Sequence, residues 1–163
     1  INCENSNGSD AAISRTAIPG STENFHFEDV NSLPGERDTY YHGNFVHDLA
    51  VSIDESFTGA DYIMPANVNI GPEDPYWPCN AYWDGYTINM FSEGGGCAGT
   101  EEMADVVYHE YGHGLQQFIY DPYSPPSSSG MGDGCSDFWS MSITSSPCLG
   151  NGLFGPGDQK GGV

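Results

Sequence analysis

The chain has 163 residues, of which 37% are hydrophobic and 13% aromatic, which suffices for one globular domain with its own core but not for two large ones. Its 23 acidic residues stand against 3 basic ones and give a formal charge of −20. Nucleic acid and anionic membrane surfaces are therefore excluded as partners, because almost nothing could neutralise a phosphate. No apolar run approaches the ~20 residues that a membrane span needs.

Cysteine usage bears on the compartment. The sequence contains no C-x-x-C pair, the spacing typical of zinc knuckles and redox sites. The N-terminus INCENSNGSD lacks the zones of a signal peptide, so the chain is either cytosolic or already processed. Scattered cysteines favour the second, a secreted and partly disulfide-bonded protein. Cys79 and Cys97 bracket a strand-like segment and are the first expected pair; Cys135 and Cys148 are the second, and Cys3 is left over.

The first part of the chain is predicted to be a loop-rich segment followed by a helix. Residues 1–37 are rich in Ser, Asn, Gly and Asp, with one strand expected at NFHFED, residues 24–29. Residues 38–163 are predicted to form one lobe. From Asp38 to about Ser56, apolar residues recur at spacings of three and four, which predicts an amphipathic helix with Asp38 as its N-cap.

Strands and two further helices follow. Apolar and polar residues alternate in YIMPANVNI (62–70) and YTINMF (86–91), which predicts two strands. Thr100, followed by two glutamates, predicts the N-cap of a helix that runs to about Tyr120. After a loop rich in Pro, Ser and Gly, a third helix is expected from about Asp133 to about Thr144. These elements predict an α+β fold.

The second helix carries the strongest functional signal, the H-E-x-x-H pattern in ADVVYHEYGHGLQQF (104–118). His109 and His113 lie one turn apart on one face, so both imidazoles can point at one ion ~2 Å away, and Glu110 can reach a water on that ion without binding the metal. The alternative is two surface histidines with a chance glutamate. Gly112 costs ~1 kcal/mol against Ala in mid-helix, which indicates that something passes close to the backbone there. The opposite face carries an apolar stripe of Val107, Tyr111, Leu115 and Phe118.

A catalytic zinc usually has a third protein ligand. No histidine follows His113, which excludes the longer metzincin pattern. Asp133 on the third helix is the candidate, with Asp121 as its rival. Asp137, one turn after Asp133, could accept the free N–H of a ligating imidazole and fix its tautomer. The alternative is an N-terminal acid with a solvent-facing partner.

These motifs resemble those of the gluzincin metallopeptidases, specifically the thermolysin-like and fungalysin-like families. DVVYHEYGHGL is similar to their active-site helix, SGMGDGCSDFW to the fungalysin-like GGMGEGWSDF, CNAYWDG to the edge-strand motif NAFWNG, and NFVHDL to NFIHDL. The matches cover roughly residues 38–145. The resemblance implies a zincin-type lobe, with a twisted, mostly antiparallel sheet packed on the active-site helix and two further helices.

The resemblance also implies roles by position. The histidines of the motif would be zinc ligands, Glu110 the general base and Asp137 the partner of His109. Asn80 and the backbone of Ala81 would hold the substrate main chain as an added strand. Asp105 matches a calcium-ligating aspartate of the thermolysin-like branch, so calcium is a second expected cation.

Two departures from the family pattern concern the third ligand and the second lobe. The family ligand is Glu, so Asp133 is one methylene shorter, and Gly132 and Gly134 would let its helix approach. The family places a mostly helical lobe after this one, which supplies a histidine to the oxyanion. That lobe is absent from this chain, and Tyr123 could donate instead. Pairing with the missing lobe or another chain is therefore expected.

The sequence predicts a secreted zinc-dependent endopeptidase, or the catalytic half of one, that acts on peptide or protein substrates. The alternative is a non-catalytic structural or assembling extracellular subunit that keeps a zincin half-fold. A third hypothesis is that the thiolate of Cys3 blocks the zinc in a latent form.

Overall fold

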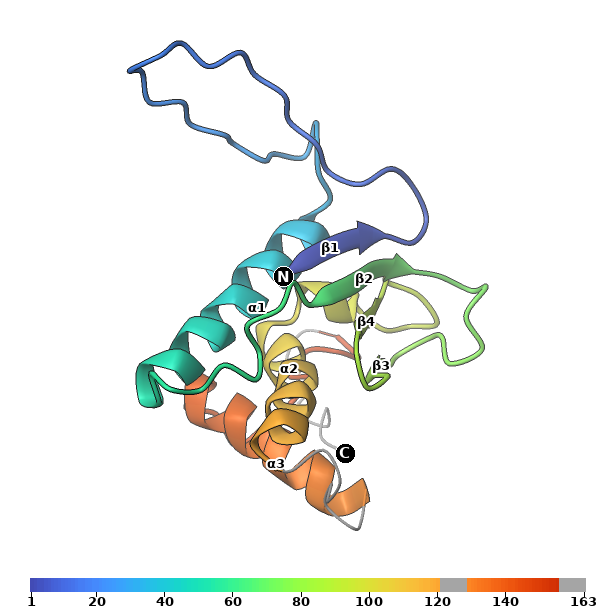
Figure 1. The fold of residues 1–163 in the computed structure, drawn as a ribbon. Helices are drawn as coiled ribbons and strands as arrows, with labels where there is room; N and C mark the ends of the chain where they lie inside the picture. Colours follow the sequence, from blue (N-terminus) through green and yellow to red (C-terminus); the bar gives the residue numbers. More distant parts are fainter. Residues whose placement is uncertain (121–128, 156–163) are drawn as a thin grey trace.

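The computed structural model describes residues 1–120 and 129–155. Figure 1 shows a small sheet with helices beside it and a long excursion between the first strand and the first helix that projects away from the body. The predicted α+β class is confirmed. The elements in chain order are β1 (Asn2–Asn5), α1 (Pro34–Ile53), β2 (Pro65–Ile70), β3 (Ala81–Trp83), β4 (Ile88–Phe91), the 3-10 turn η1 (Thr100–Glu102), α2 (Ala104–Ile119) and α3 (Ser129–Thr144).

The sheet has the order β1-β2-β4-β3. β1 pairs with β2 and β2 with β4 in parallel, and only β3 and β4 run antiparallel. The expected mostly antiparallel sheet is therefore wrong in this detail. Long connections, one of which contains α1, return the chain to the same end of the sheet, as parallel pairing requires.

The N-terminal strand lies elsewhere than predicted. Residues 24–29 form no strand, whereas β1 pairs Cys3 with Ala66 and extends the sheet at its edge. Asn2 N–H donates to the carbonyl of Met64 over 2.8 Å, and Ser6 N–H to that of Val68 over 2.9 Å. The polar sequence of β1 gives no strand signal, so pairing with a neighbour decides its conformation.

Both predicted N-caps are wrong. α1 begins at Pro34 with Leu33 as N-cap, because proline suits the first helical position and Glu36 accepts the Leu33 N–H over 2.7 Å. Thr100 begins the 3-10 turn, and α2 starts only after Met103. The hydroxyl of Thr100 is used in the sheet instead, where it accepts the Phe91 N–H over 2.9 Å.

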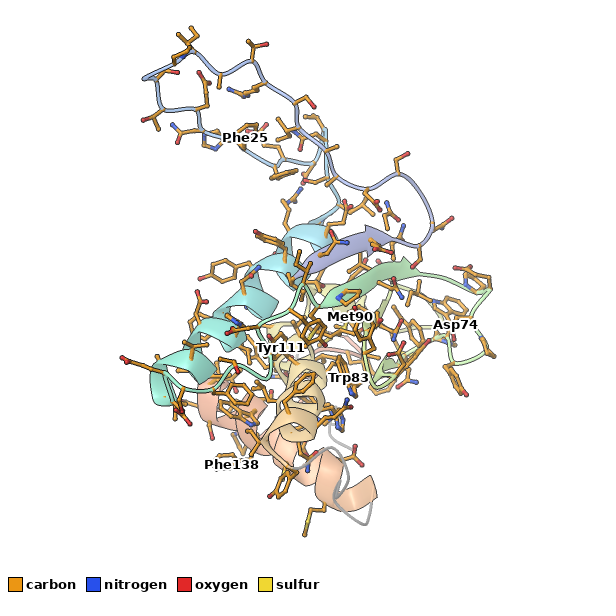
Figure 2. The ribbon with its side chains drawn as sticks, in the orientation of Figure 1. Phe25, Asp74, Trp83, Met90, Tyr111 and Phe138 are labelled. Atoms are coloured by element: carbon orange, nitrogen blue, oxygen red, sulfur yellow. A yellow bond between two sulfur atoms is a disulfide. The ribbon has the colours of Figure 1, made fainter. Side chains whose placement is uncertain are left out.

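The core lies between the sheet and the first two helices, with α3 packed on α2. Val107, Tyr111 and Leu115 are buried, as the apolar stripe predicts. Figure 2 shows Tyr111 and Met90 inside the molecule and Phe25 and Phe138 on its outside. Burial of the stripe turns the opposite face of α2, which carries the two histidines, away from the core.

One of the two expected disulfides is present. Cys79 and Cys97 are bonded, with Cα atoms 5.4 Å apart, as predicted. Cys135 and Cys148 are free, as is Cys3. The second predicted pair is wrong because Cys135 sits on α3, whereas the segment that follows Cys148 is bonded to α2 at Asp105. Within the described residues, every helix is too short or too polar to cross a membrane.

Candidate metal centre

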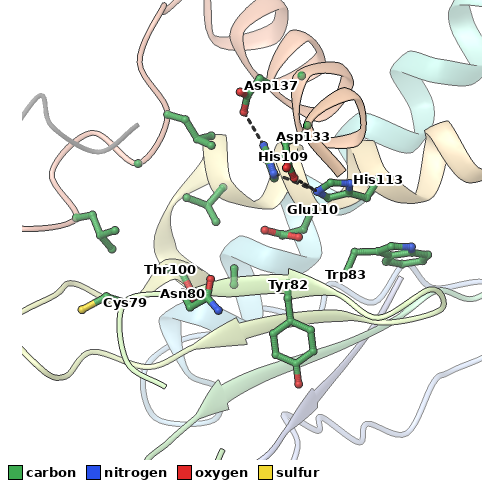
Figure 3. Close-up of a pocket in the computed structure, with 17 residues that line it drawn as sticks. Cys79, Asn80, Tyr82, Trp83, Thr100, His109, Glu110, His113, Asp133 and Asp137 are labelled. Atoms are coloured by element: carbon green, nitrogen blue, oxygen red, sulfur yellow. Dashed lines mark hydrogen bonds and ion pairs between the residues drawn. The ribbon is translucent and has the colours of Figure 1, made fainter. Parts of the chain in front are cut away.

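A cleft of about 740 Å³ opens between β3, α2, α3 and the segment after α3. Figure 3 shows His109, Glu110 and His113 from α2 facing Asp133 and Asp137 from α3, with β3 on the other side of the cleft. Chain segments far apart in the sequence thus converge on one face of α2.

Two imidazoles and one carboxylate meet in this cleft. The Nε2 atoms of His109 and His113 lie 3.2 Å apart, and His113 Nε2 lies 3.5 Å from Asp133 Oδ1. Ligands ~2.05 Å from a tetrahedral ion stand about 3.3 Å from one another, so these two separations fit a tetrahedral metal ion. The ligand atoms of the three residues all lie within 4.8 Å of one another. Among the described residues, these three form the group of His, Cys, Asp or Glu side chains with that spacing. They could hold a metal ion.

Asp137 orients the first imidazole. The Nδ1 atom of His109 is 2.8 Å from Asp137 Oδ1, and the two side chains are only 12% and 24% exposed. With the proton on Nδ1, Nε2 presents its lone pair toward His113 and Asp133. The structure thus brings Asp137 to the position that the sequence predicts for it.

The surroundings of the second imidazole favour its neutral form. Burial lowers the pKa of His113, and the neighbouring His109 acts in the same direction against the carboxylates of Asp133 and Asp137. A neutral imidazole is the form that binds a metal. Asp133 is the exposed member of the group, with 59% of its side chain accessible.

Glu110 lies in the same cleft but outside the group of three. Its side chain is 5% exposed. Burial raises the pKa of its carboxyl to about 8, the Asp133 carboxylate adds to the shift, and a hydrogen bond from the Trp83 backbone N–H opposes it. A cation among the three ligands would lower this pKa again. With a cation bound, the pKa of Glu110 can therefore lie near neutral pH, which is the range that suits a group that accepts and donates a proton.

Close packing of α3 on α2 places Asp133. A Cβ added at Gly112 would lie 3.0 Å from the Cα of Ser136, which explains the mid-helix glycine as predicted. The expected role of Gly132 and Gly134 is wrong. A Cβ at Gly132 would meet its neighbours at 3.6 Å or more, and one at Gly134 would meet nothing within 4 Å. The close approach is between Gly112 of α2 and Ser136 of α3, about one turn of α3 after Asp133.

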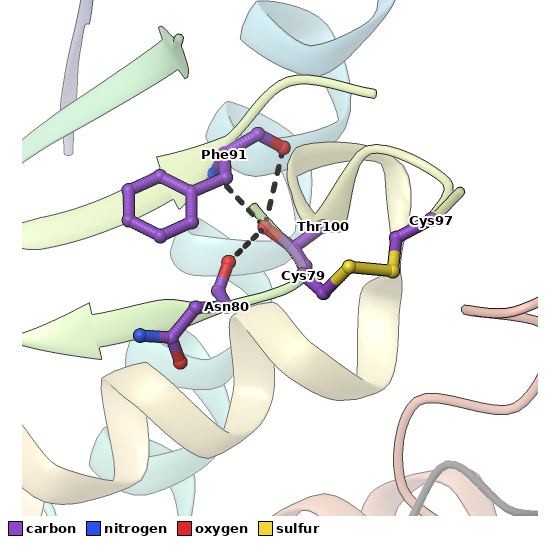
Figure 4. Close-up of a disulfide and its surroundings, with 5 residues drawn as sticks. All are labelled: Cys79, Asn80, Phe91, Cys97 and Thr100. Carbon is purple, nitrogen blue, oxygen red and sulfur yellow. Dashed lines mark hydrogen bonds between the residues drawn. A yellow bond between two sulfur atoms is a disulfide. The ribbon is translucent and has the colours of Figure 1, made fainter. Parts of the chain in front are cut away.

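The predicted substrate edge also lies in the cleft. Asn80 and Ala81 line it, and Ala81 opens β3, the strand at the edge of the sheet. The carbonyl of Asn80 accepts a hydrogen bond from the Thr100 hydroxyl over 3.0 Å. Figure 4 shows this bond beside the Cys79–Cys97 disulfide. The edge is therefore anchored from both the disulfide and the turn before α2.

Three other predicted residues have different outcomes. Tyr123 lies outside the described residues. Asp105 is not in a metal-binding group of the described chain; its carboxylate accepts the N–H groups of Val106 and Gly150 instead. Cys3 does not line the cleft, since β1 and β3 are at opposite edges of the sheet. Because Cys3 lies away from the candidate ligands, the latent thiolate hypothesis is wrong. Burial raises the pKa of its thiol to about 12.

Sequence reasoning missed the contributions of Trp83, Thr100 and the segment after α3. Trp83 and Thr100 both line the cleft, whereas the sequence predicts Thr100 only as a helix cap. The segment supplies Leu149, Gly150 and Leu153 to the cleft. The sequence signal for this segment is the pair of leucines in the Gly-rich stretch CLGNGLFG. Large apolar residues are uncommon in a fully solvated loop, so the leucines indicate that the segment packs against the protein.

The fold and this site define an α+β domain with a His-His-Asp group suited to a metal. Among solved structures, the chain is similar to the precursor of protealysin, a metalloproteinase from Serratia proteamaculans, with a TM-score of 0.57 and 16% identity. The similarity covers 88% of this chain and 42% of that one, so the chain spans less than half the length of that structure. It confirms the metalloproteinase-like fold. No protein-family model and no curated protein matches the sequence.

Proposed function

We propose that the chain is the catalytic lobe of a secreted zinc-dependent endopeptidase. The observation that carries the proposal is the spacing of the His109, His113 and Asp133 ligand atoms, which suits a tetrahedral ion. Two imidazoles and one carboxylate, with a position left open, are the donor set of catalytic zinc sites. A metalloproteinase-like fold supports the same function.

Zinc bound by these residues would supply a Lewis acid that polarises the peptide carbonyl and lowers the pKa of an attacking water toward ~7. Glu110 accepts the proton of that water and passes it to the leaving amine. Its burial keeps bulk water from competing for the carboxylate. Asp137 holds His109 in the tautomer that leaves Nε2 free for the metal.

The substrate is an extended peptide that adds to the edge of β3. Asn80 and Ala81 line the cleft, and Figure 3 shows Asn80 on the side across from Glu110. Backbone hydrogen bonds from this edge would hold the peptide main chain, and the Asn80 side chain would support it. We assign the oxyanion contact to one of two sources. It comes either from Tyr123 or from a further segment or another chain. The Cys79–Cys97 disulfide supports an extracellular location.

Zinc analysis and the Glu110→Gln variant test this function. We expect one zinc per chain in the wild type, and in Glu110→Gln the same zinc content with peptide hydrolysis reduced by about 10²- to 10⁴-fold. Glu102→Gln is the matched control, because Glu102 is an exposed glutamate just before the same helix, and it should hydrolyse normally. Asp133→Ala should lose zinc.

Two outcomes would contradict the proposal. A wild-type chain that binds no zinc removes the metal site. A chain that binds zinc but hydrolyses no peptide, even with a partner segment supplied, favours the non-catalytic extracellular subunit.

A further inference from the structure

One side of the cleft is built by a short segment that the proposed chemistry does not use. Residues 149–153, here called the tail wall, follow α3, and Leu149, Gly150 and Leu153 line the cleft with Val106 of α2. Gly150 is buried. Because the leucines belong to a turn rather than to a helix or strand, hydrogen bonds must fix their position.

The tail wall is held at two points. Gly150 N–H donates to Asp105 Oδ2 over 2.7 Å, and Ala98 N–H donates to the carbonyl of Leu153 over 2.8 Å. A third bond, from Leu153 N–H to the Gly150 carbonyl over 3.0 Å, closes the turn between them. Gly150 has φ +64°, in the left-handed region that glycine adopts most readily.

Asp105 is the centre of these contacts. It lies in the first turn of α2, one turn before His109. One carboxylate oxygen accepts the Val106 N–H over 3.0 Å, the other accepts Gly150, and the carbonyl of Asp105 accepts the Ser140 hydroxyl over 2.7 Å. One residue thus joins the metal-binding helix, α3 and the tail wall.

We propose that Asp105 is a positioning residue that fixes the tail wall through a direct hydrogen bond and so sets the shape of the apolar side of the cleft. Both carboxylate oxygens accept backbone N–H groups, so the tail wall is bonded directly to the side chain of Asp105. A carboxylate acceptor makes this bond stronger than one between neutral groups. That the cleft shape governs substrate binding rests on the proposed function; the tether itself does not.

Hydrogen exchange and kinetics of Asp105→Ala test the tether. Loss of a charged hydrogen bond should speed exchange of the Gly150 amide by about ten- to a hundredfold. For a peptide with Leu beside the cleaved bond, KM should rise about tenfold with kcat within about threefold, because the chemistry on His109 and Glu110 is untouched. For the same peptide with Ala in that place, KM should change less. Zinc content should stay at the wild-type value.

Two matched variants separate the tether from charge and folding effects. Glu102→Ala removes a nearby exposed carboxylate and should leave exchange and KM unchanged. Asp105→Asn keeps one acceptor oxygen, so exchange and KM should fall between those of the wild type and Asp105→Ala, even if the alanine variant folds poorly.

Wild-type exchange rates for residues 149–153 in Asp105→Ala or Asp105→Asn would overturn the proposal. So would wild-type exchange that accelerates in calcium-free buffer with zinc resupplied and slows again when calcium is added, since a cation would then hold the wall. If the wild type hydrolyses no peptide, the proposed function fails while the exchange measurements still decide the tether.

Discussion

His109 of α2 and Asp137 of α3 are joined by a hydrogen bond of 2.8 Å between Nδ1 and Oδ1. The bond connects the helix that carries two candidate metal ligands to the helix that carries the third. It therefore fixes both a tautomer and the relation between two elements.

Removal of this bond should weaken metal binding without abolishing it. We expect Asp137→Ala to lower zinc affinity about 10- to 100-fold, because an unoriented imidazole is a poorer ligand. Competition with a chromogenic chelator measures the affinity. Asp48→Ala removes an aspartate that is 82% exposed on α1 and should keep the wild-type affinity. Equal affinities in the two variants would argue against an orienting role for Asp137.

The contact between Gly112 and Ser136 predicts opposite effects of two glycine substitutions. Gly112→Ala puts a methyl group 3.0 Å from the Ser136 Cα, and we expect a net loss of about 1–2 kcal/mol after the gain in helix propensity. Gly134→Ala faces open space on α3 and should raise the free energy of unfolding by up to about 1 kcal/mol. Urea denaturation of the metal-free variants compares them. Equal stability of the two would contradict the close approach of the helices.

The Cys79–Cys97 disulfide closes a loop with a sequence separation of 18 residues. Removal of a disulfide that closes a loop of this size lowers the free energy of unfolding by about 3 kcal/mol, because the unfolded chain gains entropy. Cys79→Ala with Cys97→Ala should lose that amount in denaturation under oxidising conditions, whereas Cys135→Ala should lose none of it.

A thiol titration of the denatured chain without reductant provides an independent check of the pairing. It should count three thiols, from Cys3, Cys135 and Cys148. A count of one would mean that Cys135 and Cys148 pair after all.

Glu101 gives a pH dependence. Burial raises the pKa of its carboxyl to about 6, the Asn69 N–H opposes this, and Glu102 and Glu36 add to it. The folded state thus binds the proton more tightly than the unfolded chain, whose pKa is the ordinary 4.5. The stabilisation is full below about pH 4.5 and is lost as the pH rises through about 6.

Between these pH values the wild type should lose on the order of 1 kcal/mol relative to Glu101→Gln. Denaturation midpoints of the two proteins across this range provide the measurement, and exposed Glu102→Gln is the control. A constant difference between wild type and Glu101→Gln at all pH values would show that the proton is not involved.

The helix that carries H-E-x-x-H was predictable because the helical spacing of its apolar residues determines which face is buried and, with it, which face is exposed. Burial of Tyr111 and Leu115 is enough to orient His109 and His113. Asp137 followed from its spacing after Asp133. These parts of the site depend on contacts within one helix or between two helices that pack closely.

The misses depend on partners that are distant in the sequence. β1 is a strand because Cys3 pairs beside Ala66, and its own residues do not favour that conformation. Thr100 matches a helix cap in its local sequence, yet its hydroxyl is taken by Phe91 and Asn80. The tail wall needs Asp105, which precedes it by a whole helix and loop. No local pattern reports such pairings.

The hydroxyl of Thr100 bonds both to the carbonyl of Asn80 and to the N–H of Phe91, directly before the helix with the histidines. The exposed edge of β3 and the start of α2 are thereby parts of one rigid frame. Under the proposed function, an extended peptide substrate would therefore meet a binding edge that is already ordered. The conformational entropy lost on association is then mainly that of the peptide. Peptides that are flexible in solution should therefore bind less tightly than peptides that are already extended.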